Sequence, residues 1–328
     1  MCSNIWLEIT SSAEAIGFGL SLILHSILIV LVSEKPKTAF GNYKYLMLAF
    51  SVLGIFYSSC NFWSKPNVHI TKTSFIVFTV LKLSNFSKSF GSIAVTVYCS
   101  CYAMMLSLLS IHFFYRFTSV TAPFRLLTRF NRAKTPLWML FVVIYSLIWG
   151  LSSYFLCGPT ESKDLELVTE FREVYCMEPA EYAYVGPQYF YQSPDSSRVS
   201  VHFPSFIGIS ILALQMGATF ICVTYFGVRT YSTLYELGIT GYSSKELQKQ
   251  LFRTLVVQTC IPLVFMYIPV SCMFLFPIFG LKIEAIANFI PISVAVYPCL
   301  EPLVAIYIIK DFRNRIKGKE EKTGLRYH

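Results

Sequence analysis

The sequence predicts an all-α membrane protein in which seven helices cross the bilayer. Of its 328 residues, 55% are hydrophobic and only 14% are charged, whereas soluble domains carry about 25% charged residues. Seven long stretches contain almost no charge, and the basic residues fall in the loops between them. An apolar stretch of roughly 20 residues is long enough to cross a bilayer as a helix. We therefore expect one helical bundle rather than two soluble domains.

The seven stretches define a membrane domain, residues 1–315, followed by a short basic tail, residues 316–328. The expected spans lie near residues 13–33, 44–64, 90–115, 136–156, 203–228, 251–277 and 285–309. The first span follows a segment without Lys or Arg, unlike the basic start of a cleavable signal peptide, so we expect it to be retained. The apolar run Phe75–Leu81 is too short to cross and is assigned to a loop.

The distribution of basic residues predicts the orientation. With the amino terminus outside, 19 of the 27 Lys and Arg residues fall in the cytoplasmic loops and tail, as basic residues prefer. The second loop is discordant, because it carries four lysines without an acidic partner, namely Lys65, Lys72, Lys82 and Lys88. The net charge of +9 does not indicate nucleic-acid binding, because the basic residues form no single patch. The amino terminus is therefore expected outside and the tail in the cytoplasm.

The sixth expected span contains Pro262, Pro269 and Pro277. Proline removes a backbone donor and clashes with the preceding turn, so each of them can kink the helix. Neighbouring helices can satisfy the freed carbonyls inside a membrane. The pattern fits either a movable helix with a basic cytoplasmic end or an ordinary tilted packing helix.

Four motifs are distinctive, namely Tyr43–Met47, His112–Phe117, Leu247–Phe252 and Tyr297–Leu303. They resemble motifs of nematode chemoreceptors of the serpentine receptor class r (str) family. The resemblance preserves their order and spacing from the first span to the tail. It implies a bundle of the G-protein-coupled receptor type with a short cytoplasmic eighth helix and no cofactor. It also implies that the protein binds a small, volatile odorant, activates the alpha subunit of a heterotrimeric G protein, and lies in the cell membrane of chemosensory cilia.

A weaker similarity to rhodopsin-like receptors allows single positions to be compared. Arg116 precedes Pro123 by seven residues, like the arginine of the Asp-Arg-Tyr motif, but Tyr115 stands in place of the acid. Ala295 takes the place of an opsin's retinal lysine, and Tyr98 that of an amine receptor's aspartate. The similarity therefore implies neither a light receptor nor an amine receptor of the usual kind.

The last span contains Glu301, the only carboxylate well inside an expected span. Ionisable groups at such depth are costly and usually face a cavity or a partner. Glu301 and Pro302 take the place of the Asn-Pro pair of rhodopsin-like receptors, and Phe312 that of the first aromatic residue of the eighth helix. We expect Glu301 to serve either as a conformational switch or as a buried structural hydrogen-bonding group.

Basic residues mark the cytoplasmic ends of the third and sixth spans, namely Arg116, Lys249 and Arg253. The resemblance favours contact with a G-protein alpha subunit after an outward swing of the sixth helix. The alternative is that they only anchor the helix ends to anionic lipid. The expected coupling and switch residues are completed by Tyr115, Glu301, Pro302, Pro262 and Pro269.

The outer half of the third span is the expected ligand site. Tyr98 and Tyr102 are one turn apart and share a helix face, and tyrosine supplies an aromatic ring together with a hydroxyl group. Cys101 and Met105 complete the expected set. Ordinary helix packing is the competing interpretation of this tyrosine pair.

The fourth loop, residues 157–202, is long, acidic and rich in tyrosine. It is expected either to fold over the mouth of the bundle as a lid or to remain a solvated surface loop. Cys157 and Cys176 lie in it, on the oxidising side of the membrane, and could form a disulfide. Asn85 begins a glycosylation sequon on the same side.

Other functional classes fit less well. The fragment Gly150–Ser152 resembles that of a rhomboid-type serine enzyme, but the sixth span offers no histidine as a base. The five histidines are too scattered for a metal site. An odorant-gated channel or a small-molecule transporter remains the alternative, although a transporter should show more intramembrane charge or paired broken helices.

Overall fold

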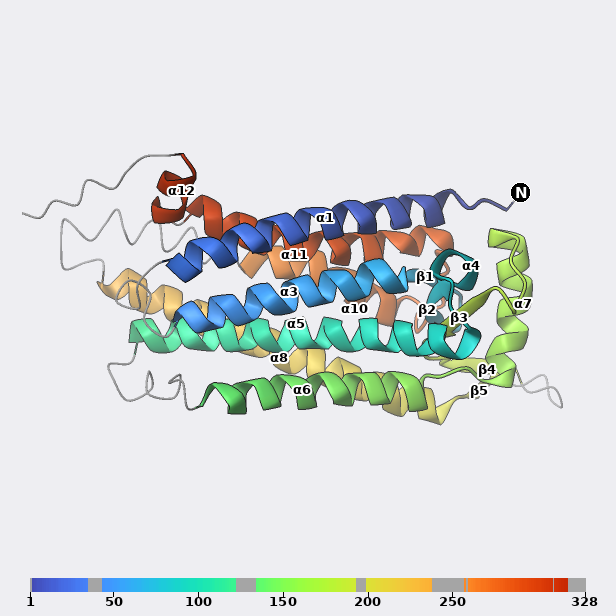
Figure 1. Cartoon of the computed structure of the whole chain (residues 1–328). Helices are drawn as coiled ribbons and strands as arrows, with labels where there is room; N and C mark the ends of the chain where they lie inside the picture. The colour runs from blue at the N-terminus through green and yellow to red at the C-terminus, as the bar shows by residue number, and fades with distance from the viewer. Residues whose placement is uncertain are drawn as a thin grey trace, which may run out of the picture.

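The computed structural model describes residues 2–34, 43–121, 134–192, 199–237, 257, 259–308 and 310–317. Six described helices are long and apolar enough to cross a membrane, and a shorter apolar helix covers Thr259–Leu275. They run side by side as one elongated bundle (Figure 1). The six long ones contain α1 (Ile5–Glu34), α3 (Tyr43–Ser64), α5 (Lys88–Thr121), α6 (Thr135–Leu151), α8 (Phe203–Leu237) and α11 (Phe289–Ile308). The predicted all-α membrane bundle is confirmed.

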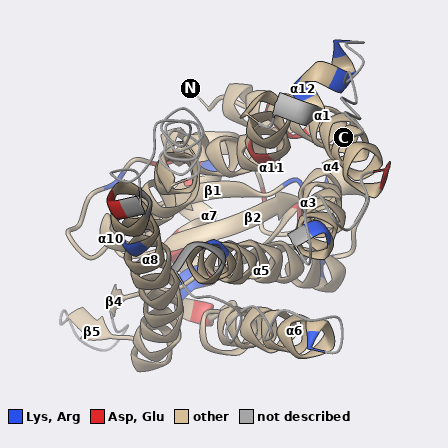
Figure 2. Ribbon diagram, turned by 90° about the vertical axis from the view of Figure 1, so that its left-hand side faces the viewer, with Lys and Arg blue, Asp and Glu red and all other residues tan. Residues whose placement is uncertain are grey.

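Helix α5 forms the centre of the bundle. It packs against α3, α6 and α8, and the view along the bundle shows it between them (Figure 2). Gly150 lets α6 approach closely, because a Cβ atom at this position would collide with the Ser100 hydroxyl of α5. This glycine therefore has a packing role in the fragment that resembled an enzyme motif.

The outward faces of the helices are apolar. On α6 the exposed large side chains include Leu137, Leu140, Phe141, Ile144 and Leu147. A soluble protein would hide such a surface, whereas a bilayer solvates it, and a helix satisfies its own backbone groups there. The surface therefore fits a protein embedded in lipid.

The sixth span is broken between its first two prolines. Pro262 precedes a π-helical turn, η4 (Leu263–Tyr267), and Pro269 lies in the first turn of α10 (Ile268–Leu275). Pro269 has no N–H group to offer to the Phe265 carbonyl four residues earlier. The Ser293 hydroxyl of α11 donates to that carbonyl instead, at 3.1 Å. A neighbouring helix thus satisfies the group that the proline leaves free.

A small sheet and a helix close the end of the bundle at which the N-terminus lies (Figure 1). The sheet has the order β1 (Asn67–Ile70), β2 (Phe75–Val80) and β3 (Tyr182–Val185), with antiparallel pairing throughout. The predicted loop at Phe75–Leu81 is therefore wrong over Phe75–Val80, which is the central strand. Its side chains are all buried, and a strand pairs backbone groups that a buried loop would leave unsatisfied.

Helix α7 (Glu161–Tyr175) packs on the sheet. Leu167, Phe171 and Tyr175 of α7 form one apolar cluster with Ile76 and Phe78 of β2, apart from the main core of the bundle. We call the sheet and α7 together the lid. The fourth loop therefore forms a folded lid rather than a solvated loop, and its tyrosines at positions 175, 182, 184 and 189 are buried.

Shorter elements complete the chain. The lid is flanked by α4 (Leu81–Ser84), the π-turn η2 (Ser152–Leu156) and a hairpin of β4 (Phe190–Gln192) and β5 (Val199–Val201). The 3-10 turn η5 (Ala285–Asn288) leads into α11, and α12 (Lys310–Ile316) follows it. Phe312 of α12 is fully buried against α1 and α3 residues such as Leu28 and Met47. The expected short eighth helix is present, and this aromatic residue anchors it.

Two of the four discordant lysines have structural partners. The Lys65 ammonium group donates to the Leu83 carbonyl at 2.8 Å, and the Lys88 ammonium group donates to the Pro179 carbonyl at 3.1 Å. Lys72 and Lys82 are exposed. Backbone carbonyls at the edge of the lid thus take the place of the acidic partners that the loop lacks.

Candidate functional site

A small, largely apolar cavity lies directly beneath the lid. The lid forms its roof, and the helices α5, α6, α8, α10 and α11 form its walls. No residue of its lining carries a formal charge. The lining comprises Val68, Phe75, Val77, Tyr98, Cys99, Tyr102, Trp149, Ser153, Cys157, Val185, Gly186, Pro187, Leu212, Val270, Met273, Phe274, Ile290 and Val294. Such a cavity suits a small, uncharged ligand.

The residues expected to bind the ligand divide into two pairs. Tyr98 and Tyr102 line the cavity. Cys101 and Met105 are buried in the core of the bundle but do not belong to the lining. The structure therefore brings the tyrosines to the cavity and leaves the other two to helix packing.

Tyr102 connects the cavity to the broken sixth span. Its hydroxyl group donates a hydrogen bond to the Met266 carbonyl of η4, at 3.1 Å. Both side chains are buried. A single residue of α5 thus touches both the cavity and a carbonyl of the π-turn in span six.

A row of aromatic rings runs from the lid into the bundle. The Phe75 ring of β2 stacks on Phe274 of α10, with 5.6 Å between the centroids. Phe274 lies 6.4 Å from Trp149 of α6, and Trp149 lies 5.5 Å from Tyr102. The lid, the cavity wall and the sixth span are therefore in continuous aromatic contact.

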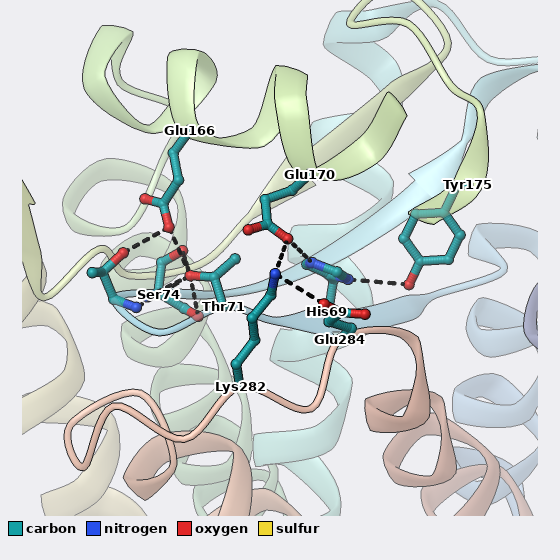
Figure 3. Close-up of polar contacts among 9 residues, drawn as sticks. His69, Thr71, Ser74, Glu166, Glu170, Tyr175, Lys282 and Glu284 are labelled. Atoms are coloured by element: carbon teal, nitrogen blue, oxygen red, sulfur yellow. Dashed lines mark hydrogen bonds and ion pairs between the residues drawn. The ribbon is translucent and has the colours of Figure 1, made fainter. Parts of the chain in front are cut away.

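Polar contacts between α7 and the sheet hold the two parts of the lid together (Figure 3). One oxygen of Glu166 on α7 accepts hydrogen bonds from the Thr71 and Thr73 hydroxyl groups, at 2.8 and 2.7 Å. These threonines form the turn between β1 and β2. Helix α7 is thereby fastened to the hairpin beneath it.

A second carboxylate of α7 reaches beyond the lid. Glu170 Oε2 lies 2.9 Å from the Lys282 ammonium group and 3.6 Å from Nε2 of His69 (Figure 3). Lys282 belongs to the connection between α10 and η5, and it also pairs with Glu284 at 2.9 Å. The His69 imidazole and the Lys282 ammonium group hold the pKa of Glu170 below its ordinary value. This cluster links β1, α7 and the connection between spans six and seven.

Lys163 braces the lid from inside. Its side chain is fully buried, and its ammonium group donates to the carbonyls of Gly158, at 2.8 Å, and Gly186, at 2.5 Å. Burial lowers the pKa of Lys163 to about 8. A charged group at this position is costly to desolvate, and the two carbonyls partly compensate.

The predicted disulfide between Cys157 and Cys176 is wrong. Cys176 pairs with Cys2, whereas Cys157 is a free thiol buried in the cavity wall. The 15 residues of α7 lie between Cys157 and Cys176, which is about 22 Å of helix. The N-terminal segment instead runs beside the end of α7, where the Ser3 amide donates to the Val174 carbonyl. This approach depends on the tertiary path and is not visible in the spacing of cysteines.

At the end of the bundle opposite the lid, His112 lies between two residues that the sequence singles out, Arg116 and Glu301. Arg116 Nε donates to His112 Nε2 at 2.9 Å, and His112 Nδ1 faces Glu301 Oε1 of α11 at 3.8 Å. Because Nε2 accepts a hydrogen bond, the proton of a neutral imidazole lies on Nδ1 and points toward the carboxylate. We call these three residues the relay. The sequence predicts no role for His112 beyond its place in the motif His112–Phe117.

A second, smaller cavity lies beside the relay. His112 and Glu301 line it together with Pro262, so the relay faces the start of the broken segment of span six. Tyr115 and Pro302 are buried. Lys249 and Arg253 lie outside the described residues.

The comparisons with known proteins decide the family. The sequence model described as "Serpentine type 7TM GPCR chemoreceptor Str" matches residues 10–317. This chain belongs to the Str chemoreceptor family. Str chemoreceptors are receptors rather than enzymes, and the match covers every described helix that could span a membrane except for the first residues of α1.

Individual relatives agree with this assignment. The chain is similar to serpentine receptor class r-10 of Caenorhabditis elegans, with 33% identity over 96% of this chain and 92% of the relative. The corresponding protein of Caenorhabditis briggsae is 32% identical over the same shares. G-protein coupled receptor str-33 of C. elegans is 27% identical over 93% of this chain and 89% of the relative. The family membership establishes an integral membrane chemoreceptor.

The sequon residue Asn85 lies on the surface of this Str receptor. It is exposed at the end of α4 and adopts a left-handed backbone conformation, with φ of 55°. Its position before α5, on the lid side, leaves the amide accessible.

Among the described residues, no group of three or more His, Cys, Asp and Glu side chains is placed to hold a metal ion.

Proposed function

We propose that this receptor binds a small, uncharged and volatile odorant in the cavity beneath the lid and activates a heterotrimeric G protein at the opposite end. The observation that carries the proposal is the contact of Tyr102 with both the cavity and the Met266 carbonyl. A ligand that displaces Tyr102 removes a hydrogen bond from the π-turn of span six. Only a ligand that binds the two positions of this span with different affinity shifts the equilibrium between them.

The cytoplasmic relay supports the second half of the proposal. The acid that usually holds the arginine of rhodopsin-like receptors is replaced by Tyr115, and Arg116 is held by His112 instead. Movement of span six beside the second cavity changes the surroundings of His112 and Glu301, and releases Arg116 to contact the G-protein alpha subunit. The name of the relative str-33 states G-protein coupling for that protein, and we extend it to this chain.

Ligand binding in the cavity is tested with the purified receptor in lipid nanodiscs. A panel of small volatile ketones, esters and alcohols is screened for compounds that raise the melting temperature, because a ligand that binds only the folded state stabilises it. The variant Leu212→Trp fills the cavity from α8 and should abolish the shift. Leu137→Trp, on the exposed face of α6, is the matched control and should retain it. A shift that survives Leu212→Trp would place the ligand elsewhere.

A ligand-gated channel or a transporter is the competing class. Odorant-dependent current or uptake in membranes that contain only the receptor would support it.

We propose that the receptor lies in the cilia of chemosensory neurons and that it is glycosylated at Asn85. Loss of a glycosidase-sensitive mass difference in Asn85→Gln tests the modification, and an unchanged mass difference would exclude this site.

A further inference from the structure

The lid is a folded unit that separates the cavity from the outer solution. The lower face of its sheet contributes Val68, Phe75, Val77 and Val185 to the cavity, while the upper face of the sheet packs on α7. Both faces of the three strands are buried. A ligand that arrives from outside therefore has to displace the lid, and the contacts between the lid and the bundle control that step.

One of these contacts is an ion pair between the lid and the connection from span six to span seven. Glu170 of α7 and Lys282 are 2.9 Å apart, and their side chains are only 20% and 27% exposed. The same Glu170 oxygen lies 3.6 Å from Nε2 of His69, and Tyr175 OH lies 3.3 Å from Nδ1 of that imidazole (Figure 3). Partial burial strengthens a charge pair because the local dielectric constant is lower than that of water.

Helix α7 also contributes to a second ion pair, which is more exposed to solvent. Arg172 and Glu178 are 2.7 Å apart, but their side chains are 58% and 56% exposed, and both residues belong to the lid segment itself. Exposed pairs of this kind contribute little to stability. This pair cannot fasten the lid to the bundle, so it provides a matched control for the pair formed by Glu170.

We propose that Glu170 and Lys282 form an ionic latch that holds the lid closed, and that opening of this latch limits the exchange of ligand between the cavity and the outer solution. Lys282 lies in the connection that follows α10, and Phe274 of α10 stacks on Phe75 of the lid. The lid and span six are thus joined on both sides of the cavity roof. A shift of span six lengthens the distance between Glu170 and Lys282 and weakens the latch. A bound ligand that draws the lid and span six together shortens that distance and strengthens the latch.

The proposal of a latch rests on the proposed function only for the identity of the ligand. The opening of the lid is measurable without any ligand. Cys99 lines the cavity as a free thiol beneath the lid. In a receptor that keeps the Cys2–Cys176 disulfide and has the other seven free cysteines replaced by serine, Cys99 reports access from outside. The probe is a charged, membrane-impermeant methanethiosulfonate reagent, added to cells that display the receptor.

We expect slow labelling of Cys99 in this parent receptor. Lys282→Met and Glu170→Gln should each raise the labelling rate roughly tenfold, whereas Lys282→Arg should keep it slow and Arg172→Met should change it less than twofold. Two independent latch variants protect the test against the loss of one through misfolding. Unchanged labelling in both latch variants, or equal acceleration in Arg172→Met, would refute the latch.

The result stands apart from the proposed function. Faster labelling in the latch variants, combined with no odorant binding by any variant, supports the latch and contradicts the ligand site. Odorant binding with unchanged labelling supports the site and contradicts the latch. Where both hold, the latch variants should raise the association and dissociation rates of the odorant together.

Discussion

Arg116 donates a hydrogen bond to His112 one turn earlier on α5, and this imidazole turns its other nitrogen toward Glu301 of α11. The contact joins the third and seventh spans at the end of the bundle opposite the lid, the end that we propose contacts the G protein. We propose that His112 takes the place of the acidic neighbour that holds the arginine in rhodopsin-like receptors. We interpret the described arrangement as the inactive one, because Arg116 is held within the bundle.

Removing the histidine should activate the receptor without ligand. His112→Phe keeps the ring volume but removes the acceptor for Arg116, and a hydrogen bond to a charged group contributes about 1.5 to 3 kcal/mol. Basal nucleotide exchange on an added G protein should therefore rise by roughly tenfold or more. Glu301→Gln should raise it as well, by less. Basal exchange that stays at the wild-type level in both variants would exclude the relay as a switch.

The hydroxyl group of Tyr102 should carry the response to ligand. Tyr102→Phe keeps the ring at the cavity wall and removes the hydrogen bond to Met266. We expect the binding affinity to change less than threefold, while basal exchange rises and the odorant adds little further exchange. Tyr145→Phe is the matched control, since Tyr145 donates to the Gln215 carbonyl between α6 and α8 and does not line the cavity. An equal loss of response in both variants would contradict a specific role of Tyr102.

The disulfide makes a prediction about the stability of the lid. Cys2→Ser should lower the free energy of lid unfolding by about 2 to 4 kcal/mol, because the bond no longer restricts the unfolded chain. Trp6 packs against the lid cluster and provides the fluorescence signal. Cys157→Ser should have a much smaller effect. A peptide that links Cys157 to Cys176 in a non-reducing digest would contradict the pairing described above.

The buried Lys163 predicts how lid stability depends on pH. Its pKa is about 8 in the folded lid, whereas an exposed lysine has a pKa of about 10.4. Between these values the unfolded chain holds a proton that the folded lid has released, so the lid becomes more stable as pH rises through this window. The gain should approach about 3 kcal/mol, measured from the denaturant dependence of Trp6 fluorescence. In Lys163→Met this gain should be absent, and a gain that persists would assign it to other groups.

The sequence predicted the membrane bundle well because long apolar helices are specified locally. The lid was harder to predict. The run Phe75–Leu81 is too short to cross a bilayer, yet its β-branched and aromatic residues are typical of a buried strand. The pairing of Cys2 with Cys176 and the position of His112 between Arg116 and Glu301 depend on segments that are far apart in the chain. Such contacts follow from the packing of helices, which a single sequence does not specify.

The central claim is that a ligand in the cavity activates a G protein through span six. The most direct measurement is nucleotide exchange on a purified heterotrimeric G protein, with the receptor in lipid and volatile compounds that raise its melting temperature. The account predicts odorant-stimulated exchange that is lost in Arg116→Ala and in Leu212→Trp, while both variants still reach the membrane. No exchange with any G protein, accompanied by odorant-gated current in the same membranes, would contradict it.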